Sequence, residues 1–325
     1  MLSLRHLFRF KKLSPITYCR RFSLNMPIST DIVGGTKELS DENRIPLIGL
    51  GTSRIVGQLS FDTSVLAALK AGYRLFDTAE RYATEVELGN ALEKSLPQVG
   101  LKRDDIFIIT KVQIIDGNAS KWTEESVEGS LKKLKTDYLD MVLVHFPKDY
   151  AGKDDAFEIN KIGRKEVWRK LEEFKDRGII KSIGVSSYEV YHLVELFEYA
   201  KYRPVMNQFE FHPYYTRPTL VNFCERNGIF VQAFSSLMWG NKEIQQEEIV
   251  KQLCKKYGVS PQIILYAFGL NSGVGIIPKS ATPSRIQDNL HKVAAISFSE
   301  SELKAMHDLD RNAAFCSVCY SWKCL

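Results

Sequence analysis

The sequence predicts an α/β protein folded as a single (β/α)₈ (TIM) barrel with a short N-terminal β-hairpin and a C-terminal extension. From about residue 45, short apolar runs alternate with amphipathic segments. Several of these runs are continuously hydrophobic, which is typical of parallel strands covered on both faces. Eight strands, each followed by a helix or a helix-bearing loop, are the number that this barrel requires.

The eight predicted strands are IPLIGLG (45–51), RLFDT (74–78), DIFIITK (105–111), LDMVLVHF (139–146), IKSIGVS (180–186), PVMNQFEF (204–211), IFVQAFS (229–235) and VGIIPK (274–279). A doubly wound sheet is the alternative arrangement of the same elements. That fold usually carries G-x-G-x-x-G after its first strand, and the segment Gly49-Leu-Gly51-Thr-Ser-Arg54 breaks this pattern. The barrel is therefore favoured.

Helix boundaries agree with this alternation. Three segments with helical spacing of apolar residues are each followed by a glycine, and these are Gly72, Gly178 and Gly258. Glycine adopts the left-handed backbone conformation that often ends a helix. Pro218 and Gly228 bracket a further helix, since proline suits the first helical turn.

Composition and charge limit the classes of partner. The 325 residues are 44% hydrophobic and 26% charged, as in globular domains, and no run of about 18 apolar residues predicts a membrane-spanning helix. The net charge of +5 arises in residues 1–30, which hold six Lys or Arg and no Asp or Glu. Because the rest of the chain is close to neutral, we expect no nucleic-acid or membrane partner. The sequence shows no obvious interface stripe, so we expect a monomer.

The N-terminal segment differs from the rest of the chain. Residues 1–25 are basic, contain hydroxyl side chains and lack acidic ones, which is typical of a mitochondrial transit peptide. Arg20-Arg21-Phe22-Ser23 also resembles a matrix-processing site. The alternative is a disordered tail ahead of an internal start at Met26. We therefore expect a folded domain over residues 31–325, in the cytosol or, if the segment is a working transit peptide, in the mitochondrion.

The cysteines predict no metal site. Cys316, Cys319 and Cys324 cluster near the C-terminus, but no second Cys or His pair lies close by in the sequence. Reduced thiols in an intracellular protein are the preferred interpretation. H-E-x-x-H and grouped carboxylates are also missing from the sequence.

Polar residues recur where the predicted strands end. The second, third and fourth strands end at Asp77, Lys111 and His145, and Tyr82 lies five residues beyond Asp77. Later strand ends carry Ser186, Ser187, Gln208 and Ser235. Any one of these is more often a helix cap, a solvated charge or an ordinary polar residue. Together they would meet at the C-terminal end of the barrel, where such barrels carry their active sites.

These residue types suit proton donation to a carbonyl group. Tyrosine has a pKa near 10 in model peptides and is a poor acid at neutral pH. A nearby Lys ammonium would stabilise the phenolate, and an Asp would keep that ammonium charged and aimed. A histidine within hydrogen-bonding reach could orient the carbonyl oxygen. No nucleophile motif such as G-x-S-x-G offers a different chemistry.

Six segments of the chain resemble the aldo-keto reductase family, in order and with similar spacing over roughly residues 33–312. They are LFDTAERYATEVELG (75–89), IITK (108–111), LDMVLVHFP (139–147), GVSSY (184–188), NQFEFHPYY (207–215) and IIPKSATPSRIQDN (276–289). The resemblance implies a barrel enzyme that transfers a hydride from NADPH to an aldehyde or ketone, giving the alcohol and NADP⁺. Its partner would be a small-molecule carbonyl substrate.

The resemblance also implies roles for particular residues. Tyr82 would be the general acid, tuned by Lys111 and Asp77, while His145 would orient the substrate. The implied cofactor-binding residues are Gly51, Thr52, Asp77, Ser186, Ser187, Gln208, Phe234, Ser235, Lys279, Ser280, Arg285, Asp288 and Asn289. Within this set, Lys279, Ser280 and Arg285 would hold the 2′-phosphate, and Phe234 would stack on the nicotinamide. The implied substrate-binding residues are Ser53, Tyr82, His145 and Phe146.

The chain departs from the family pattern around the substrate. Ser187 stands where Asn is usual and Phe234 where Tyr is commoner, while Ser53 and Phe146 stand where pocket Trp residues are common. These changes predict a more open or reshaped substrate site. The C-terminal AFCSVCYSWKCL is also unlike the usual tail. Sugars, lipid-derived aldehydes, steroids and quinones all remain candidate substrates.

Two other functions are compatible with the same pattern. One is a catalytically weak barrel that binds NADPH and serves as a regulatory subunit, because barrel folds host unrelated functions. The other is a different barrel enzyme that uses a metal ion, or Lys111 as a Schiff-base nucleophile. The presence of all four residues Asp77, Tyr82, Lys111 and His145 favours the reductase.

Overall fold

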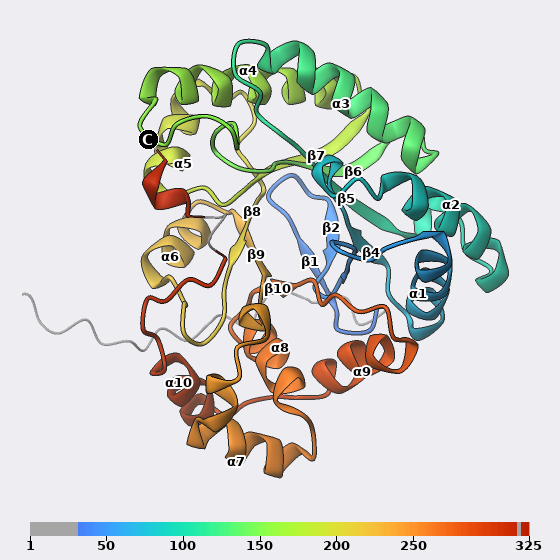
Figure 1. Ribbon diagram of the computed structural model, residues 1–325, viewed down its shortest axis with the longest axis vertical. Coiled ribbons are helices and arrows are strands. Elements are labelled where there is room, and N and C mark those ends of the chain that lie inside the picture. Colours follow the sequence, from blue (N-terminus) through green and yellow to red (C-terminus); the bar gives the residue numbers. More distant parts are fainter. Residues whose placement is uncertain (1–31, 317–319, 325) are drawn as a thin grey trace, which may run out of the picture.

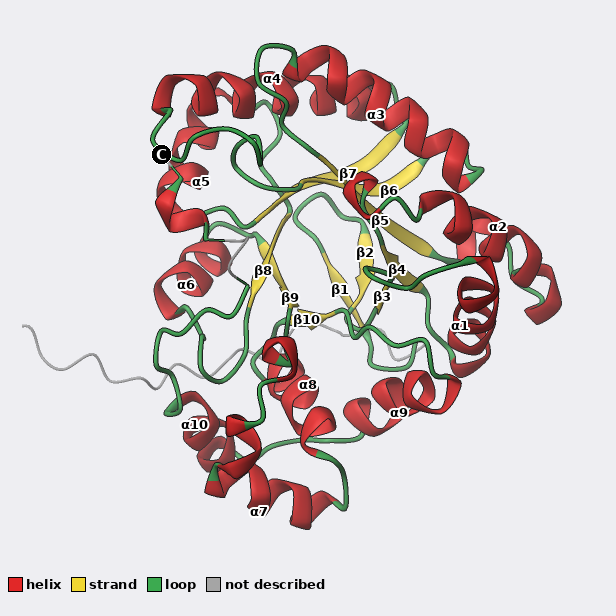
Figure 2. Cartoon of the chain, in the orientation of Figure 1, coloured by secondary structure: helices red, strands yellow, loops and turns green. Residues whose placement is uncertain are grey.

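Eight parallel strands form a barrel surrounded by helices in the computed structural model, which describes residues 32–316 and 320–324 (Figures 1 and 2). The strands are β3 (Leu50–Gly51), β4 (Leu75–Asp77), β5 (Phe107–Val112), β6 (Leu139–Val144), β7 (Ile180–Ser186), β8 (Met206–Glu210), β9 (Phe230–Phe234) and β10 (Gly275–Ile276). Each pairs with the next in chain order. A parallel bridge between Ile48 and Ile276 joins the first strand segment to the last. The barrel prediction is confirmed.

The helices lie outside the strands (Figure 2). They are α1 (Gln58–Ala71), α2 (Glu85–Ser95), α3 (Ala119–Leu134), α4 (Phe157–Asp176), α5 (Val190–Tyr199), α6 (Pro218–Arg226), α7 (Glu248–Tyr257), α8 (Pro261–Asn271), α9 (Pro283–Ala294) and α10 (Glu300–His307). Gly72 and Gly258 follow α1 and α7 with φ of 108° and 64°, and Pro218 begins α6, as predicted. No helix within the described ranges is long and apolar enough to cross a bilayer. The predicted leader, residues 1–25, lies outside these ranges.

The predicted first strand is two elements. Its first residues belong to β2 (Arg44–Pro46), which pairs antiparallel with β1 (Thr36–Glu38) in the expected N-terminal hairpin. Leu50–Gly51 pairs with β4 as β3, and Ile48 forms the bridge to Ile276. Because the apolar run is continuous, its pattern does not reveal the break. Gly49 lies between the two elements, and a Cβ there would come 2.5 Å from Leu75 Cγ, so the chain passes too close to β4 for a side chain.

The barrel interior changes from apolar to polar along its axis. Alternate residues of a strand point to the same face, so positions two apart share the interior. A cluster of buried apolar residues, separate from the larger core beneath the helices, fills its lower part with Leu39, Ile45, Leu75, Phe107, Ile109, Met141, Leu143, Val205, Met206 and Phe230. Asp77, Lys111 and His145 each follow a residue of this cluster by two positions, on or directly after β4, β5 and β6, and therefore face the same interior. Hairpin residues Leu39 and Ile45 therefore close the opposite, N-terminal end.

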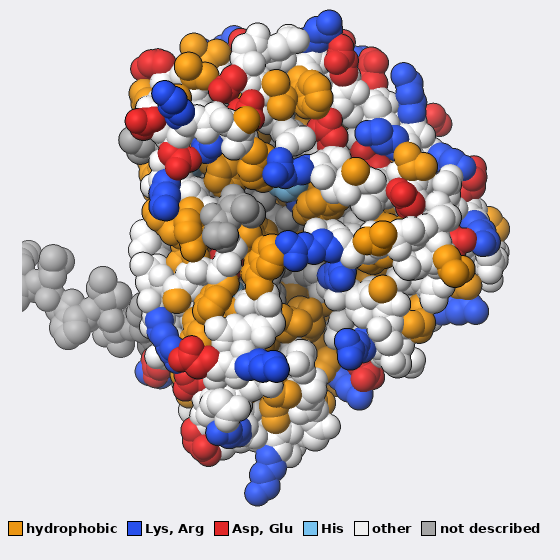
Figure 3. Space-filling model, viewed as in Figure 1, with side chains coloured by type: hydrophobic (Ala, Val, Ile, Leu, Met, Phe, Trp, Pro, Cys, Tyr) orange, Lys and Arg blue, Asp and Glu red, His pale blue; other side chains and the backbone are white. Residues whose placement is uncertain are grey.

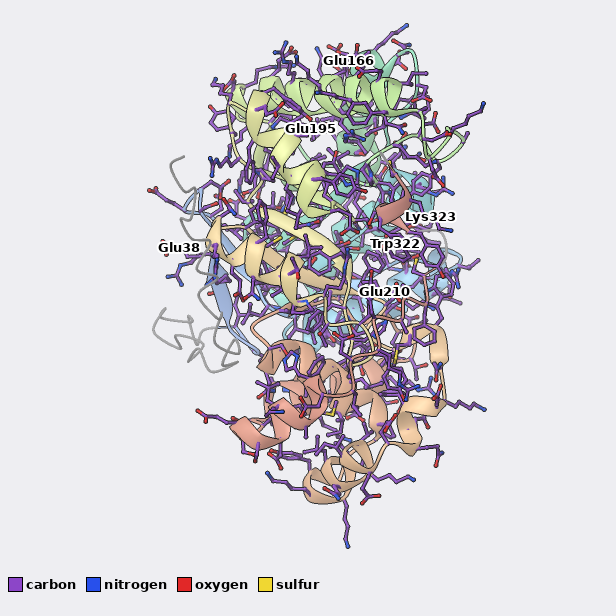
Figure 4. The ribbon with its side chains drawn as sticks, turned by 90° about the vertical axis from the view of Figure 1, so that its left-hand side faces the viewer. Glu38, Glu166, Glu195, Glu210, Trp322 and Lys323 are labelled. Carbon is purple, nitrogen blue, oxygen red and sulfur yellow. The ribbon has the colours of Figure 1, made fainter. Side chains whose placement is uncertain are left out.

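A buried arginine fixes the loop that follows β6. Arg164 on α4 donates from Nε and Nη2 to the two carboxylate oxygens of Glu195 on α5, each at 2.8 Å. Its Nη1 donates to the carbonyl of Pro147 at 3.0 Å. The Arg164 side chain is 1% exposed. Glu195 and the exposed Glu166 of α4 are labelled in Figure 4.

We predict that Glu195→Ala lowers the free energy of unfolding by about 3 kcal/mol, because it leaves a buried guanidinium without its counter-charge. The control Glu166→Ala removes an exposed carboxylate from the same pair of helices and is expected to change stability by no more than about 0.5 kcal/mol. Urea denaturation of both variants measures the difference. Equal denaturation midpoints for the two variants would show that the Glu195 carboxylate does not stabilise the fold through Arg164.

Candidate active site

The C-terminal ends of three neighbouring strands place an acid, an amine and an imidazole together. Asp77 ends β4, Lys111 is on β5, and His145 directly follows β6. Their side chains are inaccessible, with Asp77 2%, Lys111 1% and His145 8% exposed. Tyr82 ends a short 3₁₀ turn, Glu80–Tyr82, that follows β4 and returns over the barrel mouth. The structure thus brings together the three predicted strand-end residues and Tyr82, which follows the first of them.

The core of the site is an ion pair. The Lys111 ammonium donates to both carboxylate oxygens of Asp77 at 2.7 Å and to the carbonyl of Thr78 at 2.9 Å. Burial lowers the pKa of Lys111, and the Asp77 carboxylate opposes that effect. An isolated ammonium would lose its proton in such a place, so Asp77 is what favours the charged form.

Tyr82 lies between this ammonium and His145. Lys111 Nζ is 3.4 Å from the Tyr82 hydroxyl oxygen, to which it can donate. On the other side, the Tyr82 and His145 rings meet edge to face with centroids 5.6 Å apart and planes at 81°. A phenol with a cation on one side and an imidazole on the other is suited to release a proton to a group bound beside it.

His145 is a neutral imidazole in this setting. Burial lowers its pKa well below the usual 6.5, and the positive charges of Lys111 and Arg81 lower it further. Its Nδ1 is buried and has no hydrogen-bond partner within residues 32–316 and 320–324. A buried polar atom of this kind has unused capacity for a hydrogen bond.

Gln208 holds the ion pair from the other side. Its Nε2 donates to Asp77 Oδ2 at 2.8 Å and to Gln232 Oε1 at 2.7 Å. Gln208, which the resemblance assigns to the cofactor, thus also orients the Asp77 carboxylate. Gln232 was not predicted, although a glutamine within the apolar run IFVQAFS, two residues before Phe234, is the signal that could have found it.

The other cofactor candidates of the barrel rim lie at the same end. Thr52, directly after β3, donates from Oγ1 to the Asp77 carbonyl at 2.8 Å. A Cβ at Gly51 would come 2.8 Å from the Ile277 carbonyl oxygen. Glycine therefore lets β3, the first barrel strand, approach the residue that follows β10, the last one. The remaining rim candidates are Ser186 and Ser187 at the end of β7 and Phe234 and Ser235 at the end of β9.

The adenosine candidates form a separate group around the first turn of α9. Lys279 and Arg285 are exposed, and neither makes an ion pair with any residue that the structure describes. Ser280 is buried and its Oγ accepts a hydrogen bond from the Thr282 amide at 3.1 Å. Two free cations at a helix N-terminus fit a phosphate. Asn289 is buried beside them, whereas Asp288 pairs with Lys292 at 2.9 Å.

The substrate candidates other than Tyr82 and His145 lie in the loops after β3 and β6. Ser53 is half-buried in the loop after β3. Phe146 is buried and stacks on Tyr150 with centroids 5.1 Å apart, and Tyr150 in turn meets His145 edge to face at 5.9 Å. Tyr150 was not predicted, because it lies in a loop with no strand or helix pattern to place it. Figure 3 shows a hollow near the centre of one face, bordered by basic side chains and with a histidine at its margin.

Comparison with known proteins places this geometry in a family. The sequence profile described as "Aldo/keto reductase family" matches residues 47–311. Aldose reductase B of Dictyostelium discoideum is 32% identical over 296 residues, which cover 87% of this chain and 94% of that protein. A probable NAD(P)H-dependent D-xylose reductase of Emericella nidulans is 32% identical over 307 residues, covering 86% and 95%. The crystal structure of a Bombyx mori aldo-keto reductase in complex with NADP has a TM-score of 0.79 at 28% identity and covers 87% and 94%.

We predict that the His145 ring takes up no proton as the pH falls from 8 to 6. Nitrogen-15 NMR of labelled histidine follows the ring directly, and His145→Asn identifies its signal. Because only the unfolded chain binds this proton below pH 6.5, the free energy of unfolding should also decline as the pH falls through that value. A titration midpoint near 6.5 would mean that His145 is accessible to water and can be cationic in the folded protein.

Proposed function

The chain belongs to the aldo/keto reductase family, and we propose that it is an NADPH-dependent oxidoreductase that reduces an aldehyde or ketone to the alcohol. The observation that carries this proposal is the contact series from Asp77 through Lys111 to Tyr82, beside a neutral His145. The named relatives that reduce carbonyl compounds support the same reaction class.

Tyr82 is the proton donor in this proposal. The carbonyl oxygen of the substrate accepts a hydrogen bond from the Tyr82 hydroxyl, and that proton passes to the oxygen as the alcohol forms. When bound, NADPH would supply the hydride that adds to the carbonyl carbon. The phenolate left on Tyr82 is stabilised by the Lys111 ammonium 3.4 Å away, whose own charge is maintained by Asp77.

His145 positions the carbonyl without competing for the proton. A cationic imidazole would be a stronger acid than a phenol and would offer a second, badly placed donor. Burial and the two neighbouring cations keep the pKa of His145 low, so the ring stays neutral and acts through a hydrogen bond.

The residues for the cofactor are arranged in two groups, which fits an extended dinucleotide. Near the tetrad (Asp77, Tyr82, Lys111 and His145), Ser186 and Gln208 would hold the carboxamide and Phe234 would stack on the nicotinamide. Around α9, Lys279, Ser280 and Arg285 would hold the 2′-phosphate, and Asn289 would contact the adenine. The unpaired charges of Lys279 and Arg285 support a preference for NADPH over NADH, since that phosphate is a dianion.

The alternatives are less well supported. A regulatory barrel without turnover would not require a buried, costly ion pair aimed at a phenol. A Schiff-base lysine must reach an open cavity as a neutral amine, whereas Lys111 is 1% exposed and donates to three protein oxygen atoms at 2.7 to 2.9 Å.

Tyr82→Phe is expected to reduce kcat by about 10²–10⁴, because it removes the general acid and leaves the ring in place. Steady-state assays of NADPH oxidation with a generic aldehyde measure this, and cofactor binding should change little. The matched control is Tyr257→Phe on the outer helix α7. The Tyr257 hydroxyl donates to the Ser297 carbonyl, far from the site. Retention of more than a tenth of the wild-type kcat in Tyr82→Phe would exclude Tyr82 as the proton donor.

Arg285→Ala is expected to weaken NADPH binding at least tenfold and to leave NADH binding almost unchanged, because a hydrogen bond to a charged group contributes about 1.5–3 kcal/mol. Fluorescence titration with both cofactors measures the two affinities. Lys251→Ala, which removes an exposed cation from α7, is the control. Equal losses for the two cofactors would show that Arg285 does not recognise the 2′-phosphate.

A further inference from the structure

Arg81 is a cation at the edge of the active site that touches neither the carbonyl group nor the cofactor in the reaction described above. It lies in the same 3₁₀ turn as Tyr82, directly before it, and its side chain is exposed. Its guanidinium carbon is 3.9 Å from the centre of the Tyr150 ring, and Nη1 donates to Gln113 Oε1 at 3.2 Å. Two contacts from different loops therefore fix a side chain that would otherwise sample many rotamers.

The Tyr150 ring connects this cation to the catalytic imidazole. Tyr150 meets His145 edge to face at 5.9 Å and stacks on Phe146 at 5.1 Å with planes at 21°. A single aromatic ring thus separates the Arg81 guanidinium from His145. The positive charge of Arg81 acts on the His145 ring and helps to lower its pKa.

The loop that carries Tyr150 is held independently of Arg81. Lys148 is 6% exposed, and its ammonium donates to the carbonyls of Asp149 at 2.9 Å and Gly152 at 2.6 Å. It also pairs with Asp154 at 3.5 Å. The Asp149 carboxylate accepts the amide of Ala151 at 2.8 Å. Both carboxylates beside Tyr150 are therefore engaged within the loop.

Arg81 has no acidic partner in the described part of the chain. Other arginines near this end of the barrel are paired, Arg164 with Glu195 and Arg217 with Glu189. Within residues 32–316 and 320–324, no carboxylate, including that of the adjacent Glu80, forms an ion pair with Arg81. An ordered guanidinium without a counter-charge, next to a catalytic site, presents a planar fork that matches the two oxygens of a carboxylate or a phosphate.

We propose that Arg81, supported by Tyr150, selects carbonyl substrates that carry an anionic group at the end remote from the reacting carbon. This inference rests on the proposed function and names its substrate class. The carbonyl lies between Tyr82 and His145, the middle of the substrate lies against Tyr150, and a carboxylate or phosphate meets the guanidinium.

The test compares two aldehydes of the same shape that differ in charge, 4-formylbenzoate and its methyl ester. The wild-type protein with NADPH is expected to have a higher kcat/KM for the acid. Arg81→Leu should lower the ratio of acid to ester at least tenfold, mainly through KM, and Arg81→Lys should restore part of it. Arg169→Leu, which removes an exposed arginine from the outer surface of α4, should leave the ratio unchanged. An unchanged ratio in Arg81→Leu excludes a carboxylate-selective site, and the phosphate pair below then decides the inference.

A second comparison distinguishes the two kinds of anion. Glyceraldehyde and glyceraldehyde 3-phosphate are assayed in the same variants. A ratio that depends on Arg81 for the phosphate pair and not for the benzoate pair assigns the site to phosphate, and the reverse assigns it to carboxylate. Dependence in neither pair overturns the inference.

A binding measurement separates failure of this inference from failure of the proposed function. Calorimetric titration with 4-(hydroxymethyl)benzoate, in the presence of NADP⁺, needs no turnover. At least tenfold weaker binding to Arg81→Leu than to wild type supports the anion site even if neither aldehyde is reduced, in which case the reductase proposal fails alone. Equal binding to both proteins, or no binding to either, excludes a carboxylate site, and the anion site is overturned when the phosphate pair is also independent of Arg81.

Discussion

Burial inside the barrel disfavours the charged form of Lys111, and the Asp77 carboxylate opposes this effect with both oxygens 2.7 Å from the ammonium. Removing two charges from water is costly, and the cost is offset only where geometry is good and the remaining polar atoms are satisfied. Thr78 and Gln208 provide these further hydrogen bonds. The apolar residues beneath the ion pair, among them Leu75 and Leu143, exclude water. In this low-dielectric setting the Lys111 charge stabilises the Tyr82 phenolate more strongly than it would in water.

The alternation of side chains along the barrel strands determines which site residues could be predicted from the sequence. Asp77, Lys111 and His145 end hydrophobic runs on consecutive strands, so their meeting follows from strand order and period alone. Gln232 and Tyr150 could not be placed in this way, because one interrupts a strand and the other lies in an irregular loop. The first strand was predicted too long because the run 45–51 contains no polar residue at its break. The roles of the cofactor residues came from the family resemblance, not from spacing.

The site combines a rigid floor with a rim built from separate loops. The floor uses strand residues whose positions are set by hydrogen bonding along the sheet. The rim brings Arg81, Gln113 and Tyr150 together from the loops after β4, β5 and β6. The floor can therefore be predicted from strand order, whereas the contacts of the rim appear only in the three-dimensional structure.

The central claim is that Asp77 maintains a charged Lys111 next to Tyr82. Nitrogen-15 NMR of lysine side chains at pH 7.5, with Lys111→Met to assign the signal, tests it directly in the wild-type protein and in Asp77→Asn. We expect an ammonium signal in the wild type. We expect a lower pKa for Lys111 in Asp77→Asn, because burial then acts without opposition. A neutral amine in the wild type, or a Lys111 pKa that does not change in Asp77→Asn, would contradict it.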